Sequence, residues 1–254
     1  EREREIRDFN KKSFYKISGK FSKEEDTLEI TADWKAIEGS DYFESPKLYS
    51  EVGFNKKEDA EELITKLRDI GFGTIKEVKK TKEKKNPPLL YNLAELQNEC
   101  TKRFKISPDE TLKIVQNLYE KKMVTYPRTD ARVLSTAVAK GVRKNIIKLR
   151  NMPIGEDLAA VTNEIIEKNY EKGILKSKYV DDSKIADHYA IIPTGEGKDT
   201  ISKLSSLDKQ VYFVILRRFL AIFYPPAQYS KMAITILVGK ENFIINKKHL
   251  VLIY

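Results

Sequence analysis

The segment KKMVTYPRTDARVLS, residues 121–135, places a phenol, a guanidinium and a carboxylate close together in the chain. A tyrosine hydroxyl attacks a phosphodiester when a cation neutralises the phosphate and the ring is held in line with the leaving oxygen. Pro127 favours an extended backbone at Tyr126, and the fork of Arg128 can hold two phosphate oxygens. We expect Asp130 to orient Arg128. These residues allow nucleophilic chemistry on a phosphate, although a loop tyrosine packed on its neighbours is the simpler interpretation.

A second chemically capable side chain lies in DDSKIADHYAIIPTGEG, residues 181–197. His188 is one of two histidines in the chain, follows Asp187 and precedes an apolar run typical of a strand. An imidazole can contact a scissile phosphate as a cation or relay a proton. A histidine beside an apolar strand can also be purely structural, so both interpretations of His188 stay open.

Composition bounds the class of protein and of partner. The 254 residues are enough for one large domain or two ordinary ones, and the formal net charge is +9. Such an excess favours polyanionic partners, either nucleic acid or an acidic membrane surface, and a lysine-rich solvated surface explains it equally well. The single cysteine, Cys100, excludes an intramolecular disulfide and a cysteine-rich zinc site. We expect Cys100 in the core.

The longest apolar run, VYFVILRRFLAIFY, is interrupted by Arg217 and Arg218. It is also too short to cross a bilayer, so no membrane partner is expected. The chain opens on EREREIRDF without a methionine, and we expect it to be the interior of a longer protein.

The first third of the chain indicates mixed strand and helix. TLEITADWKAI, residues 27–37, alternates like a pair of strands, and residues 56–73 form an amphipathic pattern that Gly71 would close. Residues 74–88, TIKEVKKTKEKKNPP, begin as a strand and continue into lysines and two prolines. This stretch predicts a linker at a domain boundary. A solvated edge strand and a direct DNA contact are the alternatives.

Two helices are expected next. Asn92 with Glu95, and Ser107 with Pro108 and Glu110, are typical helix starts. A short extended MVTY follows the second helix, so the pair resembles a winged helix-turn-helix, with a plain helical hairpin as the alternative. The apolar face expected for the second helix consists of Leu112, Val115, Leu118 and Tyr119.

Further helices are expected over residues 135–149, 155–170 and 205–224, the last capped by Ser205 and Asp208 and ended by two prolines. Residues 229–254 return to strand alternation. The expected fold is therefore a multidomain α+β protein in which a helical domain is inserted into a discontinuous β-rich domain. The expected parts are residues 1–85 (β-rich), 86–225 (helical, carrying Tyr126) and 226–254 (the returning strands).

Four stretches resemble type IA DNA topoisomerases, and the topoisomerase III branch most. In chain order they are NPPLLYNLAELQNEC, MVTYPRTDARVLS, DHYAIIPT and LDKQVYFVILRRFLAIFYPPAQY, and they span most of residues 86–229. The resemblance implies the family's β-rich arch domain with an inserted, winged-helix-like helical domain. The flanking strands, including ENFIINKKHLVLIY, resemble the arch more loosely.

The resemblance also implies roles for single residues. Tyr126 matches the nucleophile that holds a 5′ DNA end as a phosphotyrosine during relaxation or decatenation, and Arg128 matches the arginine that positions the scissile phosphate. His188 matches a histidine that orders the cleavage site. Because they lie next to Tyr126, Lys121, Lys122, Asp130 and Arg132 are candidates for DNA binding, with solvated surface charge as the alternative for the basic ones.

The family's acidic metal site belongs to a TOPRIM domain whose motifs do not occur in this sequence. Mg²⁺ is therefore expected as a cofactor of the full-length enzyme, bound outside this chain, with no metal bound here; Asp181 and Asp182 are not assigned to it. Single-stranded DNA and the TOPRIM domain are the expected partners, at the nucleoid or plasmids of the cytoplasm. This chain alone is expected to be inactive. The competing hypothesis is a non-catalytic, winged-helix module that binds single-stranded nucleic acid.

Overall fold

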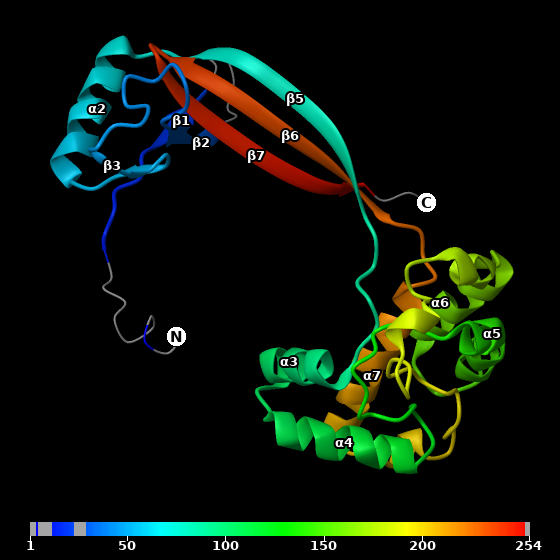
Figure 1. Cartoon of the computed structure of the whole chain (residues 1–254). Helices are drawn as coiled ribbons and strands as arrows, with labels where there is room; N and C mark the ends of the chain where they lie inside the picture. Colours follow the sequence, from blue (N-terminus) through cyan, green and yellow to red (C-terminus); the bar gives the residue numbers. More distant parts are fainter. Residues whose placement is uncertain (1–3, 5–11, 23–28, 252–254) are drawn as a thin grey trace. The chain divides into compact units, whose positions relative to one another are not determined.

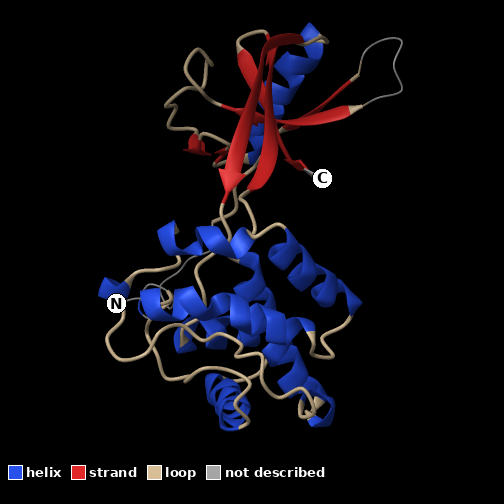
Figure 2. Cartoon of the chain, turned by 90° about the vertical axis from the view of Figure 1, so that its right-hand side faces the viewer, coloured by secondary structure: helices blue, strands red, loops and turns tan. Residues whose placement is uncertain are grey.

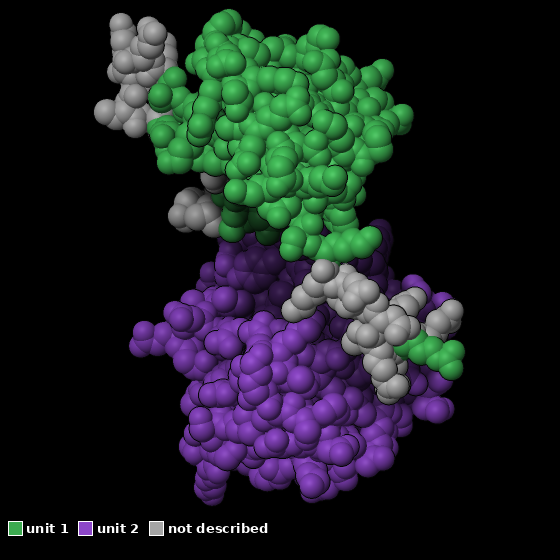
Figure 3. All heavy atoms as spheres, turned by 90° about the vertical axis from the view of Figure 1, so that its left-hand side faces the viewer, with its two compact units in different colours: residues 1–84, 228–254 green, residues 85–227 purple. Residues whose placement is uncertain are grey.

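The structure is a computed structural model that describes residue 4 and residues 12–22 and 29–251. It divides into two compact units, the first formed by residues 1–84 and 228–254 and the second by residues 85–227 (Figure 3). Figure 2 shows that one unit is rich in strands and that the other consists of helices joined by loops. The mixed class of helices and strands predicted from the sequence is confirmed, and the strand pairs described below show that the sheet is antiparallel.

The first unit is built on a five-stranded sheet in the order β1-β2-β7-β6-β5. The pairs β1–β2, β2–β7 and β6–β7 are antiparallel, and β5, β6 and β7 are long ribbons (Figure 1). The elements are β1 (Ser18–Phe21), β2 (Ile30–Lys35), β3 (Leu48–Ser50), β4 (Gly53–Phe54), α2 (Lys57–Ile70), β5 (Thr74–Lys85), β6 (Ala227–Val238) and β7 (Glu241–Val251).

The core of this unit is centred on a tryptophan. Trp34 is fully buried and stacks on Phe54 with ring centroids 4.9 Å apart. Its Nε1–H donates to the Glu241 carboxylate at 2.7 Å, and the same carboxylate accepts from the Ser40 hydroxyl at 2.7 Å. Burial of Glu241 is tolerated because these donors replace water around its charge.

The first third of the chain differs from the prediction in its strands and agrees with it in its helix. The described residues of this stretch form one strand, β2 (Ile30–Lys35), and not a pair of strands; β2 pairs with β1 upstream and with β7. Residues 27 and 28, like residues 252–254 of the last predicted strand, lie outside the described residues. The predicted helix is α2, and Gly71 ends it in the left-handed conformation with φ 75°.

Residues 74–85 form the alternative, a solvated edge strand, and not a linker, because β5 runs without a break from Thr74 to Lys85 at the edge of the sheet. Lysine-rich sequence has little strand preference of its own. Here the neighbouring strands supply the missing stabilisation: β6 pairs with β5, and Glu83 forms salt bridges to Lys231 and Lys248 at 2.5 and 2.9 Å.

The second unit packs its helices around α7, which is buried along most of its length. Asn92, Ser107 and Ser205 cap their helices as predicted, each accepting from a backbone N–H three residues on. Cys100 is buried, as expected. The helices are α3 (Leu93–Phe104), α4 (Pro108–Glu120), α5 (Thr136–Arg150), α6 (Glu156–Glu167) and α7 (Ser206–Ala221), with 3₁₀ turns η1 (Tyr170–Lys176), η2 (Asp182–Lys184) and η3 (Ile201–Lys203).

The buried face of α4 differs from the predicted one. It runs through Thr111, Ile114, Val115 and Leu118, whereas Tyr119 is 42% exposed. Adjacent residues in a helix point about 100° apart, so Tyr119 leaves the stripe that ends at Leu118. No described helix is long and apolar enough to cross a membrane.

Candidate active site

Tyr126 follows a short ladder between two segments that are far apart in the chain. Val124 forms an antiparallel bridge with Pro193, and the Thr125 N–H donates to the Ile192 carbonyl at 3.0 Å. The Thr125 hydroxyl accepts from the Ile192 N–H and donates to the Ala190 carbonyl, both at 3.0 Å. The Thr125 side chain therefore connects the residues just before Tyr126 to the extended segment after His188.

A second set of hydrogen bonds holds the loop that follows Tyr126. The Thr129 hydroxyl donates to the His188 carbonyl at 2.6 Å and accepts from the Ala131 N–H at 3.1 Å. The Ala190 N–H donates to the Val133 carbonyl at 3.0 Å. The backbone on both sides of Tyr126 is thus bonded to the backbone around His188.

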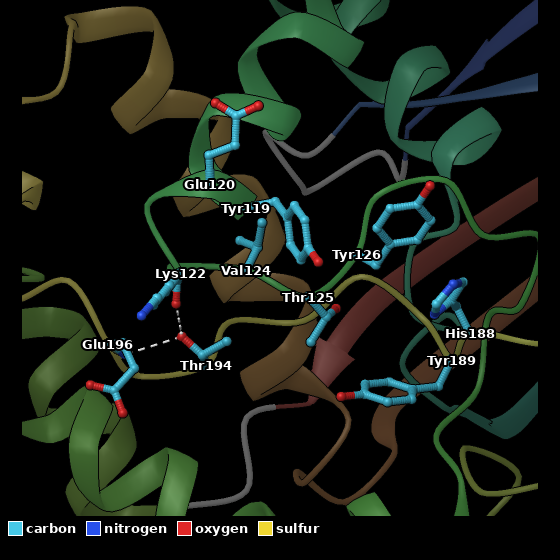
Figure 4. Close-up of a pocket in the computed structure, with 10 residues that line it drawn as sticks. All are labelled: Tyr119, Glu120, Lys122, Val124, Thr125, Tyr126, His188, Tyr189, Thr194 and Glu196. Carbon is cyan, nitrogen blue, oxygen red and sulfur yellow. Dashed lines mark hydrogen bonds between the residues drawn. The ribbon is translucent and has the colours of Figure 1, made fainter.

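These hydrogen bonds bring together the aromatic rings of Tyr119, Tyr126 and His188. The rings of Tyr126 and His188 lie 4.3 Å apart between centroids, and those of Tyr119 and Tyr126 lie edge to face at 5.4 Å. Figure 4 shows the Tyr126 hydroxyl directed away from the His188 ring. Tyr119 comes from the last turn of α4, so a helix and two extended segments jointly hold the ring of Tyr126.

The rings border an open hollow of about 570 Å³. Its floor is fixed by Thr194, whose hydroxyl donates to the Lys122 carbonyl at 2.6 Å and accepts from the Glu196 N–H at 3.1 Å. Lys122 has φ 59°, a left-handed conformation that turns the chain from α4 into the ladder. The hollow is lined by Tyr119, Glu120, Lys122, Val124, Thr125, Tyr126, His188, Tyr189, Thr194 and Glu196 (Figure 4).

Arg128 and Asp130 follow Tyr126 in the chain and do not line the hollow. The Arg128 side chain is exposed and donates to the Gln116 amide oxygen at 3.5 Å. The Asp130 carboxylate has no salt bridge or hydrogen bond to any described residue, and its carbonyl accepts from Asn92 Nδ2 at 3.1 Å. The expected contact between Asp130 and Arg128 is therefore not present, because Gln116 on α4 is the neighbour of the guanidinium.

The other flanking basic residues differ in their surroundings. Lys122 lines the hollow, and Lys121 is exposed just beyond α4. Arg132 is half-buried, donates to the Leu90 carbonyl at 3.2 Å and pairs with Glu95 at 3.2 Å. Arg132 thus fastens the start of α3 to the loop after Tyr126.

A cation stabilises the scaffold behind His188. The Tyr91 carbonyl accepts from the Ile191 N–H at 2.8 Å. Arg218 of α7 lies 4.0 Å above the Tyr91 ring, and donates to the Tyr91 hydroxyl at 2.8 Å and to the Leu89 carbonyl at 2.9 Å. Burial raises the pKa of Tyr91 to about 12, against the opposing effect of Arg218. The phenol is a neutral structural partner.

Several residues of the hollow were not singled out from the sequence. Tyr119 was assigned to the core face, and Thr125, Tyr189 and Thr194 carry no motif of their own. Burial raises the pKa of the Tyr189 phenol. The adjacency of Thr125 to Tyr126, and of Tyr189 to His188, is the only sequence signal that would have included them.

The acidic residues of the described chain do not fit a site for Mg²⁺. No three His, Cys, Asp or Glu side chains in residues 12–22 and 29–251 gather as metal ligands. The adjacent aspartates Asp181 and Asp182 are already engaged by other groups of the chain. Asp182 accepts from the Thr136 N–H at 2.9 Å, and Asp181 accepts from Ser183 and pairs with Lys184. Hydrogen bonds to these partners lower the pKa of both carboxyls.

Comparison with known proteins gives one consistent family. A family model described as DNA topoisomerase matches residues 1–252. DNA topoisomerase 3 of Bacillus cereus (strain ATCC 10987 / NRS 248) is 33% identical over 249 residues, which cover 97% of this chain and 31% of that protein. DNA topoisomerase 3 of Bacillus subtilis (strain 168) is 37% identical over 175 residues, 68% of this chain and 23% of that protein. The chain spans less than a third of the length of these curated relatives.

A solved structure has a similar fold. Full-length topoisomerase I from Thermotoga maritima aligns with 98% of this chain and 36% of its own, with a TM-score of 0.59 and 23% sequence identity.

Proposed function

Since this chain belongs to the type IA DNA topoisomerase family, we propose that it supplies the strand-cleaving tyrosine of such an enzyme. The Tyr126 hydroxyl oxygen attacks the phosphorus of one DNA strand, and the P–O3′ bond breaks. The phenol proton is lost and the departing 3′ oxygen gains one, so that the 5′ phosphate remains on Tyr126 and a 3′ hydroxyl is released. Religation is the reverse attack by that hydroxyl. The phosphoester bond is conserved throughout, so no ATP is required for resealing.

The observation that carries this proposal is how Tyr126 is held. Its ring lies between Tyr119 and His188, on two hydrogen-bonded segments, and borders an open hollow. A fixed phenol beside space for a substrate is what in-line attack needs. Arg128 is exposed, with only the long 3.5 Å bond to Gln116, so its guanidinium is available to a phosphate. We propose that Arg128 binds the scissile phosphate and that His188 orders the Tyr126 side chain.

The surrounding charge suits a DNA backbone. We assign Lys122, which lines the hollow, to DNA phosphates. Arg132 is assigned to the scaffold because its guanidinium is already bonded to Leu90 and Glu95. We propose that α3 and α4, with the extended segment that leads to Tyr126, form a winged-helix-like binding element for single-stranded DNA.

No metal is assigned to this chain, since the described residues offer no set of metal ligands. The relatives are about three times as long as this chain, and we propose that relaxation or decatenation, at chromosomal or plasmid DNA in the cytoplasm, requires a Mg²⁺-binding TOPRIM domain of the same enzyme. Mg²⁺-dependent relaxation of supercoiled plasmid by this chain alone would contradict the proposed requirement for a TOPRIM domain.

A trapping experiment tests the nucleophile. Single-stranded DNA labelled at its 3′ end is incubated with Mg²⁺ and an enzyme in which this chain is joined to its TOPRIM domain, then denatured and separated on a gel. One substrate carries sulfur in place of the bridging 3′ oxygen, because a thiolate leaves more readily and religates poorly. Label that migrates with the protein is the adduct. We expect Tyr126→Phe to abolish it and to leave DNA affinity within about twofold.

The hollow offers matched controls. Tyr119→Phe and Tyr189→Phe each remove one neighbouring phenolic hydroxyl, and both should keep the adduct. An adduct that survives Tyr126→Phe would assign the nucleophile elsewhere. DNA binding by the enzyme that includes the TOPRIM domain, without any adduct on the sulfur substrate, would favour the non-catalytic binding module.

A further inference from the structure

The lysine-rich strand β5 is exposed along its whole length and plays no part in the Tyr126 site. It lies at the edge of the sheet. Lysines on an edge strand discourage pairing with another chain. That role explains charge on β5, but it does not explain why the charges on its two faces differ.

One face of the ribbon has its charge partly neutralised by acidic partners. Glu83 pairs with Lys231 and Lys248, which are opposite each other in the β6–β7 register. Two residues apart on β5, and therefore on one side of the strand, Glu77 pairs with Lys79 at 2.9 Å. Hydrogen bonds from the two lysines lower the pKa of Glu83 to about 2, so this neutralisation persists at every physiological pH.

The other face carries unopposed charge. Because side chains alternate along a strand, Lys80, Lys82 and Lys84 point away from the face of Glu83, as does Lys76 further along. Lys247 joins them, since it is adjacent to Lys248 on β7. We call these five residues the lysine stripe. All five are exposed, and none forms a salt bridge with a residue that the structure describes, whereas Lys79, Lys231 and Lys248 on the opposite face each have an acidic partner.

The lysine stripe begins where the core of the unit ends. The pairs Ile234–Ile245 and Met232–Lys247 are consecutive on the same face of β6 and β7. Ile245 is buried in the core, whereas Lys247 is exposed. Glu241, the acidic residue on this face of β7, lies at the core end and is buried under the donors described above. Beyond the core, this face is therefore basic and uncovered by its own unit.

We propose that the lysine stripe is a second binding site for the sugar–phosphate backbone of DNA, separate from the Tyr126 hollow. Lysines on alternate strand residues are spaced by about 7 Å, so Lys76 to Lys84 extend over roughly 27 Å. Phosphates rise by about 3.4 Å per nucleotide along one strand of a duplex, so the row spans about eight nucleotides. Recognition by charge predicts binding without sequence preference.

The two faces of the ribbon supply a test with a matched control. The stripe variant replaces Lys80, Lys82 and Lys84 by Gln, and the control variant replaces Lys79, Lys231 and Lys248 by Gln. Both lower the net charge by the same amount. Affinity for a labelled single strand and for a duplex is measured by fluorescence anisotropy at several salt concentrations, with thermal unfolding to verify folding.

We expect the stripe variant to bind roughly 10- to 100-fold more weakly at low salt, and to lower the slope of log affinity against log salt by about 2 to 3. The control should lose much less. Loss with the duplex alone or with the single strand alone would identify the form of DNA that is bound. Equal losses in both variants, or none in the stripe variant, would overturn the proposal. The result is independent of Tyr126, because no covalent adduct is measured.

Discussion

The Tyr126 hollow and the lysine stripe are both assigned to DNA, but they are built in opposite ways. The hollow is held by part-buried hydrogen bonds between two segments distant in the chain, and its key rings contact one another. The stripe consists of exposed side chains without bonds to described residues, on a strand with no buried position. Chemistry at a single phosphorus atom requires fixed geometry, whereas attraction to a row of phosphates requires only charge in the right place.

This difference determines how each region should respond to change. Loss of the Thr125 hydroxyl should damage the hollow, because its partners Ala190 and Ile192 are buried and their backbone groups cannot turn to water. Loss of one lysine should leave the fold of the stripe intact, because surface substitutions away from special contacts usually change stability by less than about 0.5 kcal/mol.

The largest effect is expected at Thr125. Thr125→Val keeps the shape of the side chain but leaves the buried Ile192 N–H and Ala190 carbonyl without their partner. We expect a loss of roughly 1–3 kcal/mol in the free energy of unfolding of this unit, with adduct formation slowed more than tenfold. Denaturant unfolding and the trapping experiment measure the two effects. Thr125→Ser, which keeps the hydroxyl, is the control, and unchanged adduct formation in the valine variant would show that the ladder does not set the position of Tyr126.

A smaller effect is expected at Tyr119. Its ring contacts Tyr126 edge to face at 5.4 Å, a contact that contributes about 0.5–1.5 kcal/mol beyond simple burial. Tyr119→Ala should slow adduct formation by up to about tenfold and change DNA affinity much less, because the ring positions Tyr126. Tyr119→Phe retains the ring and should behave like the unaltered chain. Equal rates for the alanine and phenylalanine variants would exclude this role.

The smallest effect concerns Glu83 on the partly neutralised face of the ribbon. Its pKa is lowered to about 2 by hydrogen bonds from Lys231 and Lys248. A lowered carboxyl pKa means that the stabilisation from these bonds is fully present above the ordinary pKa range of a glutamate. It is lost as the pH falls through about 2. The carboxyl carbon of Glu83, followed by NMR, should titrate near that pH, and the double change Lys231→Gln with Lys248→Gln should return it toward the ordinary range. An ordinary titration in the unaltered chain would mean that the ion pairs do not persist in solution.

Local signals in the sequence predicted most of the helices. Asn92, Ser107 and Ser205 cap as expected because capping involves residues three apart. Gly71 ends α2 for a similarly local reason. The assignments of Tyr126, Arg128 and His188 as catalytic residues stay predictions that the trapping experiment addresses.

Non-local contacts caused the failures. β5 was predicted to end in a linker, and only the pairing of Glu83 with residues of β6 and β7 explains its full length. Tyr119 was assigned to the core because a helical repeat does not reveal which of two adjacent residues faces the neighbouring segment. Asp130 was expected to orient Arg128, but Gln116, on a helix that folds back beside the loop, is the residue in contact.

The sequence by itself determined the identity and order of the chemical groups: a tyrosine before a proline, an arginine two residues on, a histidine in a later strand-like run, and a lysine-rich stretch near residue 80. Tertiary structure alone decided that Tyr126 and His188 meet and that the lysines separate into a partly neutralised face and an unopposed one. The physical reason is that both outcomes depend on hydrogen bonds and strand pairing between residues distant in the chain, and such pairings leave no local periodicity to detect.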